Sequence, residues 1–407
     1  MPGAYPYPRF PGHSLMMRLA HPAAGFRLFV VVLALALVSG CSWFGGDEEE
    51  DPPAELVKFK ATLKIRKVWS GGIGDGSEHL RLALNVASDG AHVYAATHDG
   101  RVAAFEAVKG KRKWLRKTKL ELSAGPAVGE GVVVLGSSGG DVIALDVNDG
   151  TERWRVSVSS EVLATPALAG DHVYVRTVDG KLTALNLADG SQAWFVQQSV
   201  PRLSVRGTGA PVVIKSTVIC GFDNGRLAAY EVGDGSVIWD ILLSPPSGRT
   251  EVDRLSDLNA TVRVVGDDIY AIGYQGTLSA LAAESGQILW TRDISSHSGI
   301  AVDFNNLYVT GDASDMYAVS RRTGREHWRQ ETLLNRDVSG PAPFAGSIVV
   351  GDFDGYVHWF DVRDGSLQAR VRAGGGRITS QPLVVNDMVY VVTDDGKLYA
   401  FKDATKR

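Results

Sequence analysis

Hydrophobic and polar positions alternate along most of this chain in short runs that end at Gly-containing turns. His172–Val178 (HVYVRTV) is one such run, and Asp179-Gly180 separates it from the next, Lys181–Leu187 (KLTALNL). Alternation with a period of two and many β-branched residues predicts strands. An Asp-Gly pair between two strands predicts a tight hairpin, because both central residues of that turn need positive φ. The region therefore predicts four consecutive strands, at Thr165–Ala169, His172–Val178, Lys181–Leu187 and Ser191–Gln197.

This pattern belongs to a unit of fifteen residues that recurs down the chain. It reads Gly, any residue, an aliphatic residue, any residue, Ala and an aromatic or aliphatic residue, followed by a polar stretch, a second Gly and, four residues later, Trp. The copies begin at Gly100, Gly140, Gly180, Gly225, Gly276, Ser314, Gly355 and Gly396, mostly 38 to 41 residues apart. A period of roughly 40–50 residues with several strands per unit is typical of a β-propeller blade. The repeated Trp falls on the outermost strand, where we expect it to pack between adjacent blades.

Two copies lack the final Trp. The seventh copy has Ala369 in its place, and the eighth reaches the C-terminus first, whereas Leu63–Trp69 (LKIRKVW) has strand character and ends in a Trp without a preceding unit. Because a propeller closes its ring to avoid exposing two sheet edges, we expect Leu63–Trp69 to be the outer strand of the last blade. The other strands of that blade are predicted at Gln381–Val385, Met388–Thr393 and Lys397–Phe401. The predicted fold is all-β, an eight-bladed propeller of four-stranded antiparallel blades over residues 61–407, with seven blades as the alternative.

The N-terminal segment has the features of an export signal. Arg18 and Arg27 precede an apolar run, Leu28–Val38, which is too short to span a bilayer as a helix but suits the core of a signal peptide. The following Ser-Gly-Cys sequence, ending at Cys41, resembles the bacterial lipobox, and that resemblance implies cleavage before Cys41 and lipidation of this residue. Ser42 resembles a sorting signal for the outer membrane. A plain secretory signal with an incidental Cys is the alternative, and residues 1–40 are the predicted signal peptide.

Residues 41–60 are predicted to form a lipidated N-terminus and a flexible acidic tether. Five acidic residues at positions 47–51 precede Pro52-Pro53, and such a run does not enter a core. The whole chain has a formal net charge of −4, and loss of the three arginines in residues 1–40 makes it −7. The tether carries five of these charges, so the folded body is nearly neutral. It has no overall basic excess that would indicate nucleic-acid binding.

The sequence gives little support for an enzymatic function. The repeats resemble those of quinoprotein dehydrogenases, and that resemblance implies an adjacent Cys-Cys pair and calcium ligands around a quinone cofactor. Here the two cysteines are Cys41 and Cys220, and Cys220 lies in an apolar strand, where we expect a structural role. Most Asp residues occupy turns, and the nine His residues lack metal-ligand spacing. We expect no catalytic, cofactor or metal site; a quinoprotein-type enzyme or a small-ligand receptor that uses the central channel is the alternative.

The spacing of the repeats shows where the propeller has longer loops. The copies are 45 residues apart between Gly180 and Gly225 and 51 apart between Gly225 and Gly276. The extra length lies in Pro201–Pro211 (PRLSVRGTGAP) and Ser244–Thr261 (SPPSGRTEVDRLSDLNAT). Loops on a rigid scaffold commonly carry function. Both insertions flank the fourth blade, so we expect them to lie beside each other on one face.

The lipobox, the acidic tether, the eight repeats and these two loops together resemble the BamB family, the outer-membrane lipoproteins of the β-barrel assembly machinery. The likeness covers essentially the whole mature chain, and Glu251–Asn259 is its most specific part. It implies a non-enzymatic protein at the periplasmic side of the outer membrane, with BamA, the other lipoproteins of the complex and unfolded outer-membrane proteins as candidate partners. The family's contacts to the POTRA domains of BamA correspond here to Leu203, Val205, Arg206 and Asp257, whereas Asn259 replaces the second acid of the family pattern.

The residues of the first loop are consistent with this implication. Leu203 and Val205 alternate on one side of an extended segment, and Arg206 lies next to them. An apolar pair beside a cation is typical of an interface anchor. The alternative is that the two apolar side chains pack into the propeller while Arg206 pairs with Asp253 or Asp257.

Overall fold

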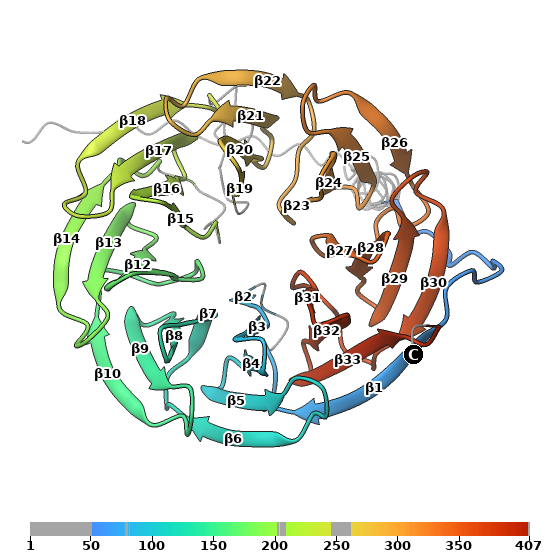
Figure 1. Cartoon of the computed structure of the whole chain (residues 1–407), viewed down its shortest axis with the longest axis horizontal. Helices are drawn as coiled ribbons and strands as arrows, with labels where there is room; N and C mark the ends of the chain where they lie inside the picture. Colours follow the sequence, from blue (N-terminus) through green and yellow to red (C-terminus); the bar gives the residue numbers. More distant parts are fainter. Residues whose placement is uncertain are drawn as a thin grey trace, which may run out of the picture. The chain divides into compact units, whose positions relative to one another are not determined.

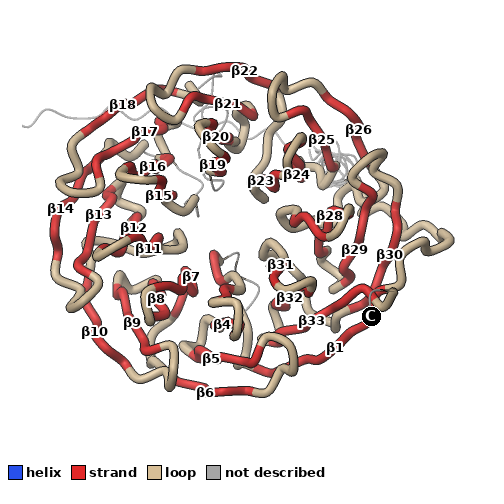
Figure 2. The backbone as a smooth tube through the Cα atoms, in the orientation of Figure 1, coloured by secondary structure: helices blue, strands red, loops and turns tan. Residues whose placement is uncertain are grey.

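The computed structural model describes residues 51–77, 80, 82–201, 203, 209–245 and 262–405. The chain divides into two units, Met1–Pro52 and Pro53–Arg407. Of the first unit only Asp51 and Pro52 are described, and both are exposed. The second unit is an eight-bladed β-propeller, whose blades form a ring around a central axis (Figure 1, Figure 2). We call the side of each blade nearest this axis the channel side. Apart from the gaps just given, no helix in the chain is long and apolar enough to cross a membrane.

Each blade is an antiparallel sheet whose strands follow one another from the channel outward. The innermost strands are β3 (Ala87–Ser88), β7 (Leu122–Gly129), β11 (Ala167–Ala169), β15 (Val212–Ile214), β19 (Arg263–Val265), β23 (Ile300–Val302), β27 (Ala342–Phe344) and β31 (Leu383–Val385). The second strands are β4 (His92–Ala96), β8 (Val132–Ser137), β12 (His172–Arg176), β16 (Thr217–Gly221), β20 (Asp268–Ala271), β24 (Asn306–Thr310), β28 (Ser347–Gly351) and β32 (Met388–Thr393).

The outer half of each blade carries the fifteen-residue repeat. The third strands are β5 (Arg101–Glu106), β9 (Asp141–Asp146), β13 (Lys181–Asn186), β17 (Arg226–Glu231), β21 (Leu278–Ala282), β25 (Met316–Ser320), β29 (Tyr356–Asp361) and β33 (Lys397–Asp403). The outermost strands are β6 (Arg112–Lys117), β10 (Glu152–Ser157), β14 (Gln192–Gln197), β18 (Val237–Leu242), β22 (Ile288–Arg292), β26 (Glu326–Gln330), β30 (Leu367–Arg372) and β1 (Ile65–Gly72). Blade 1 is β3–β6, each later blade takes the next four strands, and blade 8 combines β31–β33 with β1.

The predicted fold class and the count of eight blades are confirmed. The strands of the third blade lie within two residues of the predicted bounds: β12 ends at Arg176 instead of Val178, and β11 starts at Ala167 instead of Thr165. The reason for the later start of β11 is a tertiary contact, because Thr165 Oγ1 donates a hydrogen bond to the carbonyl of Ala83 (3.3 Å) instead of lying in the ladder.

The repeated Trp residues join the blades, as predicted. Trp69 of β1 donates from Nε1 to the carbonyl of Ala107 in the next blade (2.9 Å), and its ring covers Gly110. A Cβ at Gly110 would lie 2.3 Å from the indole, which leaves no space for a side chain. The positive φ of +69° at this position also favours glycine. The same arrangement recurs at Trp114 over Gly150, Trp154 over Gly190, Trp194 over Gly235, Trp239 over Gly286, Trp290 over Gly324 and Trp328 over Gly365.

Blade 7 reverses one pair of side chains. In the other blades the Trp of the outermost strand lies directly opposite an Ala of the third strand, as in Ala318↔Trp328. In blade 7 the pair is Trp359↔Ala369, so the indole is moved one strand inward. Trp359 is fully buried and meets Phe401 of blade 8 edge-on, with ring centroids 6.0 Å apart. Leu63, just before β1, and Ile65, the first residue of β1, pack into the same cluster, so the blade 7–8 junction is filled differently from the other seven.

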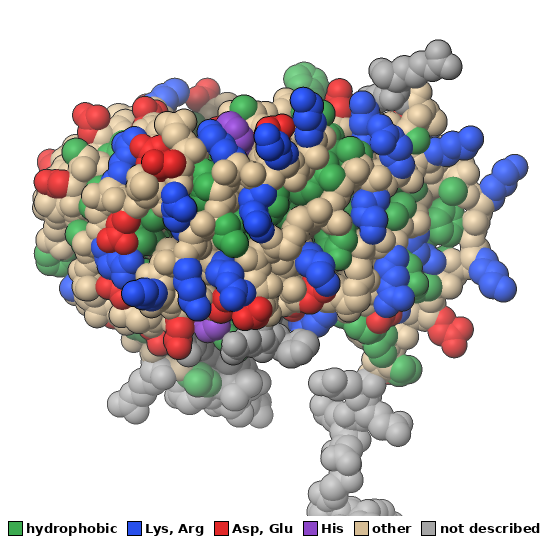
Figure 3. Space-filling view, turned by 90° about the horizontal axis from the view of Figure 1, so that it is seen from below, with side chains coloured by type: hydrophobic (Ala, Val, Ile, Leu, Met, Phe, Trp, Pro, Cys, Tyr) green, Lys and Arg blue, Asp and Glu red, His purple; other side chains and the backbone are tan. Residues whose placement is uncertain are grey.

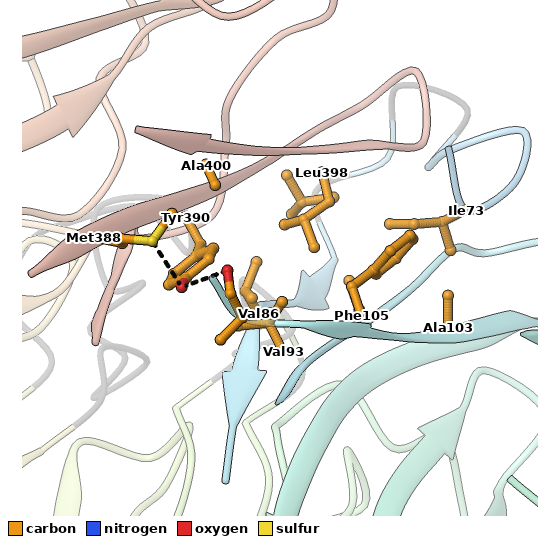
Figure 4. Close-up of a cluster of buried hydrophobic side chains, with 12 residues drawn as sticks. Ile73, Val86, Val93, Ala103, Phe105, Met388, Tyr390, Leu398 and Ala400 are labelled. Atoms are coloured by element: carbon orange, nitrogen blue, oxygen red, sulfur yellow. Dashed lines mark hydrogen bonds between the residues drawn. The ribbon is translucent and has the colours of Figure 1, made fainter. Parts of the chain in front are cut away.

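The N-terminal strand closes the ring, as predicted. β1 pairs with β33 from Ile65↔Asp403 to Gly72↔Lys397, and it extends beyond the predicted end at Trp69 because Ser70–Gly72 continue the same ladder. Apolar side chains from blades 8 and 1 pack together at this junction, with Tyr390 donating its hydroxyl to the carbonyl of Ala107 (3.0 Å; Figure 4). The first and last parts of the folded unit therefore share one core.

Candidate functional site

Both long connections begin and end on the same face of the propeller. The first runs from Gln197 at the end of β14 to Val212 at the start of β15, and the second runs from Leu242 at the end of β18 to Arg263 at the start of β19. Because strand direction alternates within a blade, every connection from an outermost strand to the next innermost strand starts and ends on one face. The two connections therefore flank blade 4 on that face, each with one end at the rim and one at the channel (Figure 1).

Hydrogen bonds between blades 3 and 4 hold the base of the first connection. The backbone N–H of Gln198 donates to the carbonyl of Gly180 (2.9 Å), and its side-chain amide donates to Asp240 Oδ2 (2.9 Å). Arg226 Nε donates to the other carboxylate oxygen of Asp240 (2.7 Å). These contacts fix the direction in which the chain leaves β14.

A buried ion pair strengthens the same junction. Arg176 at the end of β12 donates to the carboxylate of Asp223, which follows β16, and the two side chains are only 3% and 4% exposed. Burying either charge alone would cost several kcal/mol, so each depends on the other. The pair holds blade 3 against blade 4 beneath the face from which the first connection leaves.

The second connection is fixed at both of its ends. Leu243 and Ser244 each donate a backbone N–H to the carbonyl of Gly225 (3.0 Å in both cases), and both residues are buried. On the return side, Val262 is 2% exposed and packs in a cluster with Trp239 and Ile269. A rigid base at each end reduces the entropy that a loop loses when it binds a partner.

Exposed apolar side chains gather next to these connections. Eight of the twelve large hydrophobic residues that are exposed in the described part of the chain fall between positions 195 and 289: Phe195, Val200, Leu203, Val237, Ile238, Leu242, Ile288 and Leu289. Six of them lie on β14, β18 and β22, the outermost strands of three consecutive blades (Figure 1). We call the surface formed by these six side chains the apolar rim. Clustered exposed apolar side chains mark a surface that binds another macromolecule.

The apolar rim was not predicted from the sequence, although the repeats contain a signal for it. The two residues before the repeated Trp are Val237-Ile238 in the fourth copy and Ile288-Leu289 in the fifth. Most other copies have charged residues at one or both of these positions, for example Glu152-Arg153. Two aliphatic residues on a strand suggest a core position, and only the placement of that strand at the outer edge of the blade shows that they face solvent.

The structure describes one of the predicted contact residues. Leu203 is 45% exposed, so its side chain is accessible to a partner. Val205, Arg206, Asp257 and Asn259 lie outside the described residues, as do Cys41 and the predicted internal acid Asp253. What the structure adds is the support around these positions: two fixed loop bases and an adjoining apolar rim.

The alternative site, the central channel, is bridged by the chain itself. The short strand β2 (Ala83–Leu84) adds to the channel side of β7 in parallel. Arg263 reaches from blade 5 to blade 8, where it donates to Gln381 Oε1 (2.6 Å). Among the residues with assigned positions, no three His, Cys, Asp or Glu side chains could hold a metal ion together. Burial raises the pKa of the Cys220 thiol to about 12, so this thiol stays protonated and is not a nucleophile.

A cleft of about 960 Å³ lies on the other face, between blades 5, 6 and 7. Two of its three arginines are engaged within the protein: Arg321 Nε donates to the hydroxyl of Tyr270 (3.1 Å), and Arg363 pairs with Asp361 (2.6 Å). Engaged cations leave little capacity to recognise an anionic ligand. The face that carries the long connections is therefore the stronger candidate.

Comparison with known proteins points to one family. The family described as outer membrane protein assembly factor BamB matches residues 98–330 and 313–407. A protein of that name from Pseudomonas aeruginosa is 47% identical over 372 residues, which are 91% of this chain and 97% of that protein. The crystal structure of BamB from Moraxella catarrhalis has a TM-score of 0.76 and 27% identity, covering 83% of this chain and 100% of that one.

A quinohemoprotein alcohol dehydrogenase from Comamonas testosteroni also shares the propeller. Its TM-score is 0.66 at 13% identity, with 83% of this chain and 76% of that chain covered. At this level of identity the likeness concerns the fold alone, and a fold hosts many unrelated functions.

Proposed function

Because the chain belongs to the BamB family of outer membrane protein assembly factors, we propose that it is a non-enzymatic scaffold of the assembly machinery. In this role it binds the periplasmic POTRA domains of BamA, associates with the other lipoproteins of the complex and assists the insertion of β-barrel proteins. Unfolded outer-membrane proteins are a further candidate partner.

The observation that carries this proposal is the surface around blade 4. Two long connections start from rigid bases on one face, and eight exposed apolar side chains lie along or beside the adjoining rim. Protein interfaces need such apolar anchors, and they need them preorganised. Leu203, Val205, Arg206 and Asp257 are the proposed contacts to BamA, with Asn259 at their edge.

Substitution of the anchors tests the proposal. Removal of a buried interface side chain costs on the order of 2 kcal/mol, or roughly 30-fold in affinity. Arg206→Ala and Leu203→Ala should therefore release BamA in co-purification, and Ile238→Ser should weaken binding as a test of the apolar rim. Asp257→Ala should have a smaller, salt-dependent effect, and Asn259→Ala the smallest, because it carries no charge.

The matched control is Phe304→Ser. Phe304 is 89% exposed and belongs to the cleft on the other face, so its replacement removes an equally accessible apolar side chain away from the proposed surface. All variants should melt like the wild type. If Arg206→Ala lowers the melting temperature and still retains BamA, the arginine stabilises the loop internally and the interface lies elsewhere.

The proposed location is the periplasmic side of the outer membrane, with lipid on Cys41. Within the predicted tether, residues 41–60, Ala54 donates its backbone N–H to the carbonyl of Leu334 in the propeller. The preceding residues 41–53 span at most about 45 Å when extended, which keeps the propeller close to the membrane. Cys41→Ala should abolish labelling by radioactive palmitate and leave an uncleaved precursor or a soluble periplasmic protein. Palmitate incorporated into the Cys41→Ala protein would refute this assignment.

A further inference from the structure

Basic residues are concentrated in two stretches far apart in the sequence. Residues 56–74 contain five Lys or Arg residues and no acid, and residues 107–120 contain seven and no acid. The two residues before the repeated Trp of the first copy are Arg112-Lys113, where the fourth copy has Val237-Ile238. The net charge of the folded body is nearly neutral, so it does not reveal that basic residues are concentrated in these two stretches.

The fold brings the two stretches together. The first leads into and forms β1, the outermost strand of blade 8, and the second forms β6 of blade 1 and the turn before it. The two strands are neighbours because Trp69 of β1 lies over Gly110 in that turn. We call the surface they share the basic rim; its exposed residues are Lys58, Lys60, Lys64, Arg66, Lys67, Lys109, Lys111, Arg112, Lys113, Arg116, Lys117 and Lys119.

Figure 3 views the propeller from the side where β6 and β1 lie in Figure 1, and Lys and Arg side chains spread over this surface. None of the twelve forms an ion pair with any residue whose position is described. On the next blade, by contrast, Arg153 pairs with Asp146 (2.7 Å) and Arg155 with Glu152 (2.7 Å). Lys67 does contact the carbonyl of Ala373 and the ring of Tyr399. A dozen cations that form no ion pairs with described residues produce a strong positive potential that favours an anionic partner.

The basic rim lies across the ring from the apolar rim. Most of the cations lie on blades 8 and 1, while Lys58 and Lys60 belong to the segment that runs along β30 of blade 7. Blades 4 and 5, which stand opposite blades 8 and 1 in a ring of eight, carry five of the exposed aliphatic residues (Figure 1). A partner on the apolar rim would therefore leave the basic rim uncovered. The two surfaces can act at the same time.

We propose that the basic rim binds the anionic phospholipid headgroups of the membrane to which the chain is tethered. The tether delivers the propeller to that surface, because Lys58, Lys60 and Lys64 follow its acidic run at positions 47–51 and lead into β1. Composition favours lipid over a protein partner: nine of the twelve cations are Lys, a residue depleted at protein interfaces but effective in attraction to anionic membranes. The proposal goes beyond the scaffold function and uses the lipid anchor only as the source of proximity.

Vesicle binding by unlipidated protein provides the test. Residues 41–407 with Cys41→Ser, which contain all eight blades, are sedimented with phosphatidylcholine vesicles with or without phosphatidylglycerol. Each basic residue near an anionic surface contributes about fivefold in binding. The protein should bind only the phosphatidylglycerol vesicles and should be released when NaCl rises from ~0.05 to ~0.5 M.

Matched variants locate the effect. Lys111→Gln/Arg112→Gln/Lys113→Gln should weaken vesicle binding about 100-fold. Lys215→Gln/Arg322→Gln/Arg325→Gln removes the same charge from exposed positions on blades 4 and 6 and should leave binding nearly unchanged. BamA co-purification should be normal for both, so a failure of this proposal is distinguishable from a failure of the scaffold function.

Three outcomes would overturn the proposal. The first is no binding to phosphatidylglycerol vesicles, which would assign the cations to an acidic protein instead. The second is equal loss of binding in the two triple variants. The third is binding that occurs only after the five acids at positions 47–51 are replaced by their amides, which would show that the chain's own tether occupies the basic rim.

Discussion

A chain that starts after Trp69 should aggregate, whereas a chain that starts at Ala54 should be soluble and cooperatively folded. The first deletion removes most of β1, which forms the ladder with β33 from Ile65↔Asp403 to Gly72↔Lys397. It also removes Trp69, whose ring covers Gly110 and whose N–H bonds Ala107. The edge of β33 is then unpaired and the apolar junction of Figure 4 is open to water, both of which promote association.

The expected effect is large because several losses coincide. Trp69 is partly buried. Removal of a fully buried Trp costs about 3–5 kcal/mol, so the loss of Trp69 contributes up to that amount, and total stabilities are commonly only about 5–15 kcal/mol. Size-exclusion chromatography of the two deletion variants measures their aggregation, and thermal melting measures their stability. The Ala54 start is the control, since it keeps the backbone hydrogen bond from Ala54 to Leu334 and every later contact. Normal melting of the shorter chain would mean that β1 does not close the ring.

The sequence allowed the blades to be predicted because their determinants are local. Alternation, the Asp-Gly hairpins and the repeated Trp act within one repeat, so β12 and β13 lie where the pattern placed them. The strand β2 was not predicted, because two residues that pair in parallel with β7 depend on a long-range contact and not on any local pattern. The start of β11 differs for the same reason, since Thr165 bonds Ala83.

The candidate surfaces were only partly predictable. Repeat spacing located the two long connections, because extra length in a propeller goes to loops. The apolar rim and the basic rim both depend on the residues just before each repeated Trp, namely Val237-Ile238 in one blade and Arg112-Lys113 in another. These residues form continuous surfaces only in the folded ring, where the outermost strands of neighbouring blades lie side by side. The sequence of a single repeat therefore does not predict either surface.

Trp359→Ala should destabilise the propeller by about 3–5 kcal/mol, since it empties a fully buried site between blades 7 and 8. Exchange of the pair, Trp359→Ala/Ala369→Trp, would recreate the Ala–Trp order of the other blades. We nevertheless expect no rescue. Leu63 and Ile65 occupy the cluster around Ala369, so an indole at position 369 would be overpacked.

The receiving blade also lacks the feature on which the other indoles rest. Each of the seven outer Trp rings covers a Gly in the turn between the third and outermost strands of the next blade, as Trp328 covers Gly365. In blade 8 those two strands, β33 and β1, come from opposite ends of the folded unit, so no such turn exists between them. The inward position of Trp359 is thus a consequence of closing the ring with an N-terminal strand.

Urea unfolding of the single and double variants measures this dependence, with Trp328→Ala as the control for a junction of the common type. The control should lose a similar 3–5 kcal/mol, because it removes the indole that bonds the carbonyl of Val362 (3.0 Å). The exchanged protein should be at least as unstable as Trp359→Ala. Recovery to within about 1 kcal/mol of the wild type would show instead that the two positions are interchangeable and that closure places no constraint on blade 7.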